Sequence, residues 1–486
     1  MTSTLTDPPG EIAAAPPRRP RTFLIGMTIV TALAAVVRVL WVLVARRNFA
    51  LHGDDFFYHW QANALAEGKG FLNPYTWKAL GRLEPSAAHP PLYSMYLAVW
   101  SWFGFDTPLA HRLASCVLGV AGVVVVGLVA RRIAGDWAGI LAAFVAAVYP
   151  QLWINDGMLI SESMYVLVIA ATLLFAYRLW DSRSWLDAAL LGALIGLSAL
   201  TRPEAVILVP LLGIPFLFSK RDPVKRRFGT FFVIGGLCLL VILPWWVRNL
   251  TQFHDPTFLA TGNGIVLQVS NCDGTYSGQF LGYWDITCLT KDAPPTTPEE
   301  KRILEGLQGT GVPGLAYLHA VDPRDDSQLD TTAREKAFDY IGSHLSRVPV
   351  VVAARVGRIW GIFRPEQDVN FDIFFERRGY YPSWAGAYMY YALLPFALYA
   401  LIVMRKRRVP ISPMIAIFAM VTITVALAMG ITRYRVGADV VLAILGGVAF
   451  DALRRKIWGG RERADASDGD EKSAGTLATD DVPQPA

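Results

Sequence analysis

Long apolar segments recur along almost the whole chain and limit the folds open to it. We count about ten that approach the roughly 20 apolar residues of a transmembrane helix, at residues 22–45, 108–130, 137–154, 160–179, 186–201, 204–219, 229–247, 385–404, 411–430 and 438–453. Hydrophobic residues make up 53% of the chain and charged residues 17%, with a mean hydropathy of +0.36. This composition is typical of a multi-span membrane protein. We therefore expect an all-α polytopic membrane protein with about ten transmembrane helices.

Basic residues indicate how these segments are oriented. Lys and Arg gather at the cytoplasmic ends of transmembrane helices, and here every second connection is basic, at residues 18–21, 131–132, 178–183, 220–227, 405–408 and 454–456. These clusters explain the net charge of +5 better than nucleic-acid binding does. Arg46 and Arg47 depart from the rule. We expect a multi-pass protein of the plasma membrane with both termini in the cytoplasm.

This orientation divides the chain into five regions. Residues 1–21 and 456–486 are polar and are expected to be disordered cytoplasmic tails. Residues 22–247 form an N-terminal membrane module with a first outer loop at 46–107, residues 248–384 a small extracytoplasmic region, and residues 385–455 the C-terminal transmembrane helices. Within the first outer loop, a helix that begins at residue 56 and ends at Gly68 or Gly70, and a second at residues 91–104, are expected to lie along the membrane surface as interfacial helices.

The four cysteines fall into two environments. Cys116 and Cys238 lie inside apolar segments, where they are most simply packing residues. Cys272 and Cys288 share the large outer region, in which an oxidising compartment allows a disulfide. We expect this pair to be bonded, which would stabilise the folded segment by roughly 3 kcal/mol in the chain-entropy model.

Two adjacent carboxylates, Asp54 and Asp55, follow the first apolar segment in the stretch "LHGDDFFYHW". A carboxylate at this depth is partly desolvated and close to lipid headgroups, which suits a general base for a lipid-linked substrate. An Asp at the start of a helix equally serves as a cap for free backbone N–H groups. The spacing of the residues leaves both interpretations open.

The surrounding sequence resembles a known loop. "GDDFFYHWQANALAEGKGF", followed by "HPPLYSMYLAVWSWFG", resembles the first outer loop of family 39-like membrane glycosyltransferases of the GT-C fold, a group that includes the protein O-mannosyltransferases and the aminoarabinose transferase of lipid A. The pieces "ISESMY", "LTRPEAVILVP", "PWWVRN" and "RYR" agree with it. The resemblance implies a GT-C-type helical bundle and a glycosyltransferase that uses a polyprenyl-phosphate sugar.

The same resemblance implies roles for residues of the first outer loop. Asp54 matches the family's catalytic Asp, and Asp55 stands where the family has a Glu. This departure leaves the division of roles between the two open, although we favour Asp54 as the base. Tyr58 matches the family's Tyr and is a candidate for substrate binding. His89 occupies the basic position near the lipid phosphate, unless it is a hydrogen-bonded surface His.

The implied reaction is an inverting displacement on the extracytoplasmic face. Asp54 accepts the proton of an acceptor hydroxyl while that hydroxyl attacks the anomeric carbon. Cations near the leaving phosphate stabilise its developing charge. The candidates for phosphate binding are Arg248, Arg433 and Arg435, and Arg202 follows as a substrate-binding candidate. Each could instead be an interfacial anchor or part of an intramembrane ion pair.

Three further charged residues are candidates because of their depth in the membrane. Asp156 and Glu162 lie in the outer turn between the third and fourth apolar segments, where they could bind the acceptor or pair with an Arg, unless they are solvated loop charges. Either could hold a divalent metal together with Asp54 and Asp55, although no Cys/His spacing typical of a metal site occurs. Arg38, inside the first segment, is expected to snorkel or to pair with an acid.

A polytopic transporter or lipid flippase is the alternative class of function, since these proteins also combine many spans with intramembrane charge. The sequence shows no convincing internal repeat, and its charged motifs gather on the outer side, which favours the enzyme. Its expected partners are a polyprenyl-phosphate-linked sugar, membrane lipids and a protein, glycan or lipid acceptor. The sequence specifies neither the sugar nor the acceptor, and it leaves metal dependence and oligomeric state open.

Overall fold

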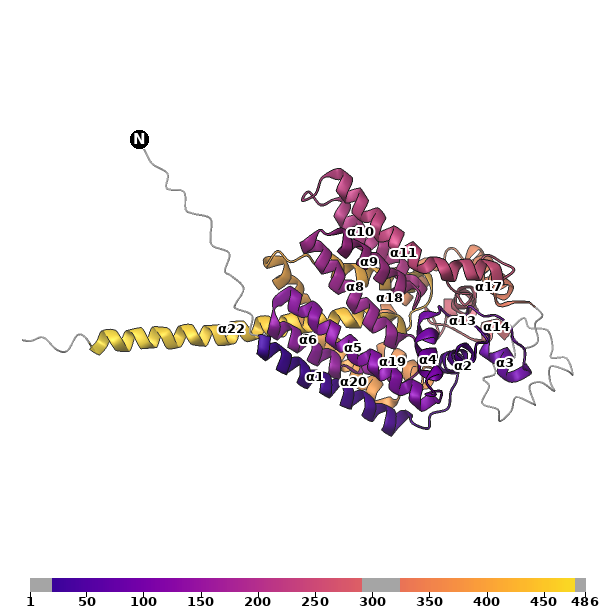
Figure 1. The fold of residues 1–486 in the computed structure, drawn as a ribbon, viewed down its shortest axis with the longest axis horizontal. Helices are drawn as coiled ribbons and strands as arrows, with labels where there is room; N and C mark the ends of the chain where they lie inside the picture. Colours follow the sequence, from indigo (N-terminus) through magenta and orange to yellow (C-terminus); the bar gives the residue numbers. More distant parts are fainter. Residues whose placement is uncertain (1–19, 291–323, 477–486) are drawn as a thin grey trace, which may run out of the picture.

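The computed structural model describes residues 20–290 and 324–476 as an all-helical protein (Figure 1). Within these ranges the structure contains no β-strand, and Leu72 and Pro85 form one isolated bridge. The expected N-terminal tail lies outside the described residues, apart from its last two positions. The expected all-α fold is confirmed for the described part of the chain.

Six helices are long and apolar enough to cross a membrane. Their bounds are α1 (Pro20–Trp41, continued by η1, Val42–Arg46), α5 (Pro108–Ala134), α8 (Glu162–Ser182), α11 (Val224–Gln252), α20 (Tyr380–Lys406) and α22 (Val436–Thr476). A bent pair, α6 (Asp136–Val148) with α7 (Pro150–Trp153) and η2 (Ile154–Gly157), raises the number to seven if it is one span. Pro150 explains the 64° bend, because proline cannot continue the helix hydrogen bonds of α6 and holds Tyr149 in an extended conformation.

The remaining apolar segments form shorter helices, namely α9 (Trp185–Ala199), η3 with α10 (Pro203–Ile207, Leu208–Leu217) and α21 (Ser412–Leu427). Every apolar segment expected from the sequence is therefore helical in the structure. The expected count of ten spans is shown only in part, because a helix of about 15 residues extends roughly 22 Å, less than the hydrocarbon thickness of about 30 Å.

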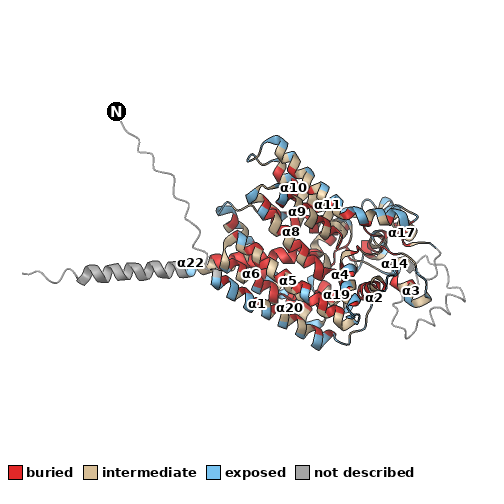
Figure 2. Ribbon diagram, in the orientation of Figure 1, coloured by how far each residue is buried: buried red, intermediate tan, exposed pale blue. Residues whose placement is uncertain are grey.

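Helix α22 lies at the centre of the bundle and is the most deeply buried of the six spans (Figure 2). Small residues allow its close packing against α6. A Cβ atom added at Gly447 would lie 2.4 Å from the backbone nitrogen of Ala142, so only glycine allows this approach. Beyond residue 455 the helix continues to Thr476, where the sequence analysis expected disorder. Proline, the strongest helix breaker, first follows at residue 483.

Shorter helices gather at one end of the bundle (Figure 1). They are α2 (Asp54–Ala66), α3 (Pro74–Leu80), α4 (Leu92–Trp102), α12 (Asn263–Ser270), α13 (Asp273–Tyr276), α14 (Thr287–Thr290), α17 (Asp326–Ser343), α18 (Val348–Ile359) and α19 (Pro365–Phe374). Helices α2 and α4 are the two segments expected at the membrane surface. One face of α4 is buried through Tyr93 and Leu97, and the opposite face exposes Val99 and Trp102. This two-sided pattern suits an interfacial helix.

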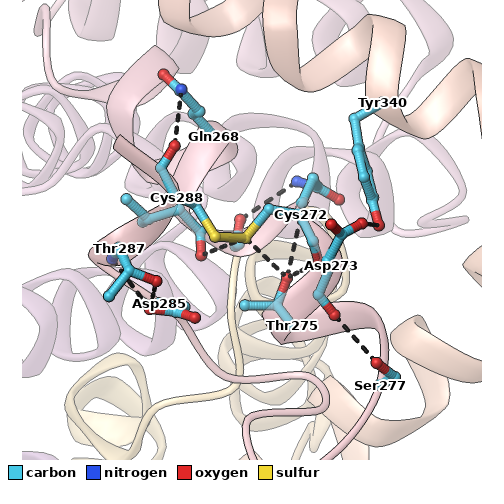
Figure 3. Close-up of a disulfide and its surroundings, with 12 residues drawn as sticks. Gln268, Cys272, Asp273, Thr275, Ser277, Asp285, Thr287, Cys288 and Tyr340 are labelled. Atoms are coloured by element: carbon cyan, nitrogen blue, oxygen red, sulfur yellow. Dashed lines mark hydrogen bonds between the residues drawn. A yellow bond between two sulfur atoms is a disulfide. The ribbon is translucent and has the colours of Figure 1, made fainter. Parts of the chain in front are cut away.

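A disulfide joins Cys272 and Cys288, the pairing expected from the sequence (Figure 3). Neighbouring hydrogen bonds attach the closed segment to other helices: Gln268 of α12 donates to the Cys288 carbonyl, and the Tyr340 hydroxyl of α17 donates to Asp273. Cys116 is buried without a disulfide partner, and so is Cys238. The disulfide thus joins the start of α13 to α14, and the hydrogen bonds attach this closed segment to α12 and α17.

Arg38 and Asp156 form a buried ion pair between α1 and η2. The Arg38 Nε atom lies 2.8 Å from Asp156 Oδ2, and both side chains are 1% exposed. The pairing of Arg38 with an acid is therefore confirmed. Gly119 of α5 makes room for the pair, because a Cβ atom at this position would lie 2.0 Å from Asp156 Oδ2 and 2.6 Å from Arg38 Nε.

We expect Gly119→Ala to destabilise the protein by about 2–4 kcal/mol, because the added methyl group overpacks the site and separates a buried ion pair. Gly236→Ala is the matched control, since Gly236 is exposed on α11 and a Cβ atom there meets no atom within 4 Å. Thermal unfolding of the purified protein in detergent measures the effect. Equal melting temperatures of the two variants would contradict the tight packing at Gly119.

Candidate functional site

A cavity of about 350 Å³ lies among the short helices at the end of the bundle that contains α2 and α12. Its volume falls within the usual range of ligand pockets. Its walls come from α2, the segment before α4, η3, α12, the disulfide-bonded segment and the 3-10 turn η4 (Thr432–Arg435). The charged and polar side chains that line it are Asp54, Tyr58, His89, Ser161, Thr201, Arg202, Glu204, Asn263, Glu376, Arg433 and Tyr434.

Asp54 and Asp55 are the first two residues of α2. The preceding Gly53 has φ +61°, a conformation that side chains rarely allow, and it turns the chain into the helix. Successive helical residues point about 100° apart, so the two carboxylates face different surroundings. Asp54 lines the cavity, with 30% of its side chain exposed. Asp55 is buried away from the cavity and accepts a hydrogen bond from the backbone N–H of His52.

Arg433 is the centre of the charged network in the cavity. Its guanidinium lies 2.7 Å from Asp54 Oδ2, 2.8 Å from Glu162 Oε1 and 3.3 Å from Glu376 Oε2. These carboxylates come from the start of α2, the start of α8 and the segment after α19. One cation in η4 therefore connects three parts of the chain that are far apart in the sequence.

Arg202 extends the network on the other side of Glu162. Its Nη1 atom lies 2.7 Å from Glu162 Oε1, and its Nε atom lies 2.6 Å from Glu204 Oε1. Glu162 is fully buried and bridges the two arginines. The alternative that Glu162 is a solvated loop charge is wrong, because it pairs with both arginines at the base of the site.

His89 and Tyr58 complete the wall around Asp54. The His89 Nε2 atom lies 3.5 Å from Asp54 Oδ1, and the His89 ring lies 4.9 Å from the Tyr58 ring, centre to centre. Pro90 and Pro91 follow His89 and fix the backbone at the entry to α4. The structure therefore brings together six of the residues singled out from the sequence: Asp54, Tyr58, His89, Glu162, Arg202 and Arg433.

The environments of the two adjacent carboxylates shift their pKa values in opposite directions. Burial alone would raise the pKa of Asp54, but Arg433 and His89 outweigh it and hold the pKa well below the ordinary value. Burial raises the pKa of Asp55 to about 7, although the His52 N–H and Arg112 act in the opposite direction. Asp54 is therefore ionised at neutral pH, whereas Asp55 titrates there.

Four residues singled out from the sequence lie elsewhere. Asp156 is paired with Arg38 inside the bundle, and Asp55 faces away from the cavity. Arg435 points into the bundle, where it lies 3.2 Å from Asp439 and covers the Tyr390 ring. Arg248 donates hydrogen bonds to the backbone carbonyls of Ser86 and Phe71 and so stabilises the segment before His89.

The sequence analysis missed two carboxylates of the site, Glu376 and Glu204. Glu204 lies two residues after Arg202 in a stretch that was already noted, and Glu376 lies just before an apolar segment in "FFERRGYY". Both were detectable only as charges beside apolar segments. Burial raises the pKa of Glu376 above its ordinary value, although Arg433 pulls it down.

The metal-binding alternative concerned Asp54 and Asp55 with Asp156 or Glu162. The structure separates these side chains, since Asp156 is bound to Arg38 and Asp55 lies outside the cavity. In the part of the chain that the structure describes, no three His, Cys, Asp or Glu side chains are grouped as metal ligands. The expected ligand set is therefore not assembled.

Comparison with known families and structures identifies the fold. Residues 88–247, about a third of the chain, match the family model described as dolichyl-phosphate-mannose-protein mannosyltransferase. A search of curated proteins gave no match. Among solved structures, the archaeal oligosaccharyltransferase AglB from Archaeoglobus fulgidus, in complex with an inhibitory peptide and a dolichol-phosphate, is similar, with a TM-score of 0.52 and 16% identity.

The match to AglB covers 92% of this chain and 52% of the AglB chain, so this chain spans about half the length of that protein. The apo form of the same enzyme gives a TM-score of 0.53. ArnT from Cupriavidus metallidurans bound to undecaprenyl phosphate is 16% identical, with a TM-score of 0.41 over 87% of this chain and 78% of ArnT. Residues 88–247 therefore match the model of the dolichyl-phosphate-mannose-protein mannosyltransferase family, and the chain has a fold similar to that of the archaeal oligosaccharyltransferase AglB.

Proposed function

We propose that the chain is a membrane glycosyltransferase that transfers a sugar from a polyprenyl phosphate to an acceptor hydroxyl on the extracytoplasmic face. The observation that carries this proposal is the position of Asp54, an ionised carboxylate that lines the outer cavity between Arg433 and His89. The family match supports the proposal, because the description of that family names dolichyl-phosphate-mannose, a sugar linked to a lipid phosphate. The dolichol-phosphate in the AglB complex agrees with a lipid-phosphate substrate for this fold.

In the proposed reaction, Asp54 orients the acceptor hydroxyl and accepts its proton. The acceptor oxygen forms a bond to the anomeric carbon as the bond from that carbon to the phosphate oxygen breaks. The polyprenyl phosphate leaves as an anion, and the anomeric centre is inverted. No sugar is bonded to the enzyme at any stage, so a single carboxylate in contact with the acceptor is sufficient.

Arg433 and His89 are the basic side chains in contact with Asp54, and we assign them to the donor phosphate. A phosphate bound there weakens the attraction between Arg433 and Asp54, which raises the pKa of Asp54 toward the range of a more effective base. Binding of the sugar donor would thus make Asp54 a stronger base for the reaction in which that donor is consumed. Glu162 and Glu376 keep the Arg433 guanidinium in position throughout.

The proposed orientation places both termini in the cytoplasm and counts the bent pair and the three shorter apolar helices as spans, which makes about ten. The cavity then opens on the outer side, where a donor carried by the lipid can enter. The acceptor approaches from the extracytoplasmic region at residues 248–384. Because the charged groups meet at this outer end, their arrangement favours the enzyme over the transporter alternative.

We expect Asp54→Asn to lower the rate of sugar transfer by at least about 100-fold, since the amide cannot accept the proton. Asp55→Asn is the matched control, because it neutralises the adjacent carboxylate outside the cavity, and it should retain most of the activity. Purified wild type and variants are incubated with labelled polyprenyl-phosphate sugars and cell-envelope acceptors. A folded Asp54→Asn variant with full activity would remove Asp54 as the base.

The pH dependence of the reaction distinguishes the two carboxylates. A general base must be deprotonated, so a base with a pKa near 7 loses activity as the pH falls through 7. A base with a lowered pKa stays active at lower pH. With Asp54 as the base, we expect kcat/KM to show no acid limb between pH 8 and about 5. If kcat/KM instead falls tenfold per pH unit below pH 7, and this pH dependence disappears in Asp55→Asn, Asp55 would be identified as the base.

Labelling with a membrane-impermeant maleimide tests the orientation. Leu83 is exposed in the first outer loop, and Arg407 is exposed after α20. We expect Leu83→Cys to react in intact cells and Arg407→Cys to react only after permeabilisation. The reverse pattern would overturn the proposed sidedness.

A further inference from the structure

A second cavity, of about 220 Å³, lies beside the first. Pro203, Ala260 and Asn263 line both cavities, so a ligand in one lies next to a ligand in the other. The rest of its wall comes from α17, from residues 256–259 and from Val206 of η3. Most of this wall belongs to residues 248–384, so in the proposed orientation the second cavity receives a ligand from the aqueous side.

The lining combines a few polar side chains with ring faces. Asp330 is 5% exposed, and its Oδ1 atom accepts the Gly264 N–H at 2.5 Å. Its Oδ2 atom lies 3.4 Å from Arg334 Nη1. Phe258 and Pro256 supply ring surfaces in the same cavity. A carboxylate accepts hydrogen bonds from hydroxyl groups, and a guanidinium donates hydrogen bonds to them. Ring faces pack against the C–H face of a sugar.

The backbone around Asp330 is fixed by close packing. A Cβ atom at Gly264 would lie 2.0 Å from the Asp330 carbonyl oxygen, so α12 packs directly on α17 at this point. The carboxylate is therefore held by two helices before any ligand arrives. Preformed polar groups of this kind set the orientation and specificity of small ligands.

We propose that the second cavity binds one sugar residue of a glycan acceptor, next to the residue whose hydroxyl reacts at Asp54. This inference rests on the proposed function, because it assigns the acceptor of that reaction. The volume suits a single ring, since it is smaller than the roughly 300 Å³ at which pockets for drug-sized ligands begin. Asp330, Arg334 and Asn263 bind its hydroxyl groups.

Direct binding tests the proposal without relying on catalysis. Full-length protein in detergent is titrated with methyl α-D-mannopyranoside, methyl α-D-glucopyranoside and methyl α-D-arabinofuranoside, and with an acetylated Ala-Thr-Ala amide as a peptide probe. Saturation-transfer NMR reports the contacts. We expect at least one glycoside to bind the wild type with a millimolar Kd, and Asp330→Asn to weaken this binding by about tenfold or more.

Asp339→Asn is the matched control, because Asp339 is exposed on the same helix, and it should bind as the wild type does. Arg334→Gln, at a half-exposed position, provides a second test if Asp330→Asn unfolds. Melting temperatures establish that each variant is folded.

Three results would overturn the proposal: no glycoside binds the wild type, both the Asp330 and Arg334 variants bind like the wild type, or the peptide binds in place of the glycosides. The outcome is separable from the proposed function. A protein that transfers sugar but binds no glycoside contradicts only the second cavity, whereas a protein that binds glycosides but transfers no sugar contradicts the proposed reaction.

Discussion

The guanidinium of Arg433 holds together three carboxylates that begin or connect different helices of the bundle. Asp54 lies 379 positions away in the sequence, yet the two side chains are in contact. Without this cation, Asp54 and Glu376 would lose their arginine partner and Glu162 would keep only Arg202, and an unpaired buried charge costs several kcal/mol. The geometry of the outer cavity therefore depends on this one residue.

The contact with Arg433 also makes Asp54 differ in its chemistry from the neighbouring carboxylate, Asp55. Asp54 and Asp55 are consecutive in α2, but the turn of the helix directs one to the cavity and the other into the protein. Arg433 and His89 keep Asp54 ionised, and burial keeps Asp55 partly protonated at neutral pH. In many enzymes, two neighbouring acids have different pKa values because their environments differ, and this difference gives them separate roles in acid–base catalysis.

The sequence was sufficient to locate the helices, because each apolar segment carries its own signal of length and composition. Charged residues were harder to assign, since their partners are determined by packing between distant segments. Arg433 and Arg435 are two residues apart, yet one reaches the cavity and the other pairs with Asp439 inside the bundle. Asp156 was a candidate either for binding the acceptor or for pairing with an Arg, and only the bend at Pro150 shows that its partner is Arg38. Glu376 has no distinguishing neighbours in the sequence, and only the fold brings it to Arg433.

One end of the bundle thus combines the proposed base, the basic side chains that we assign to the donor phosphate, and a wall supplied by the disulfide-bonded segment through Trp284 and Ile286. The central claim is that an acceptor oxygen, deprotonated by Asp54, displaces the lipid phosphate in one step. The stereochemistry of the product tests this most directly. With a polyprenyl-phosphate sugar of known anomeric configuration, NMR of the transferred sugar should show the inverted anomer. Retention of configuration would contradict the single displacement and require a covalent sugar–enzyme intermediate.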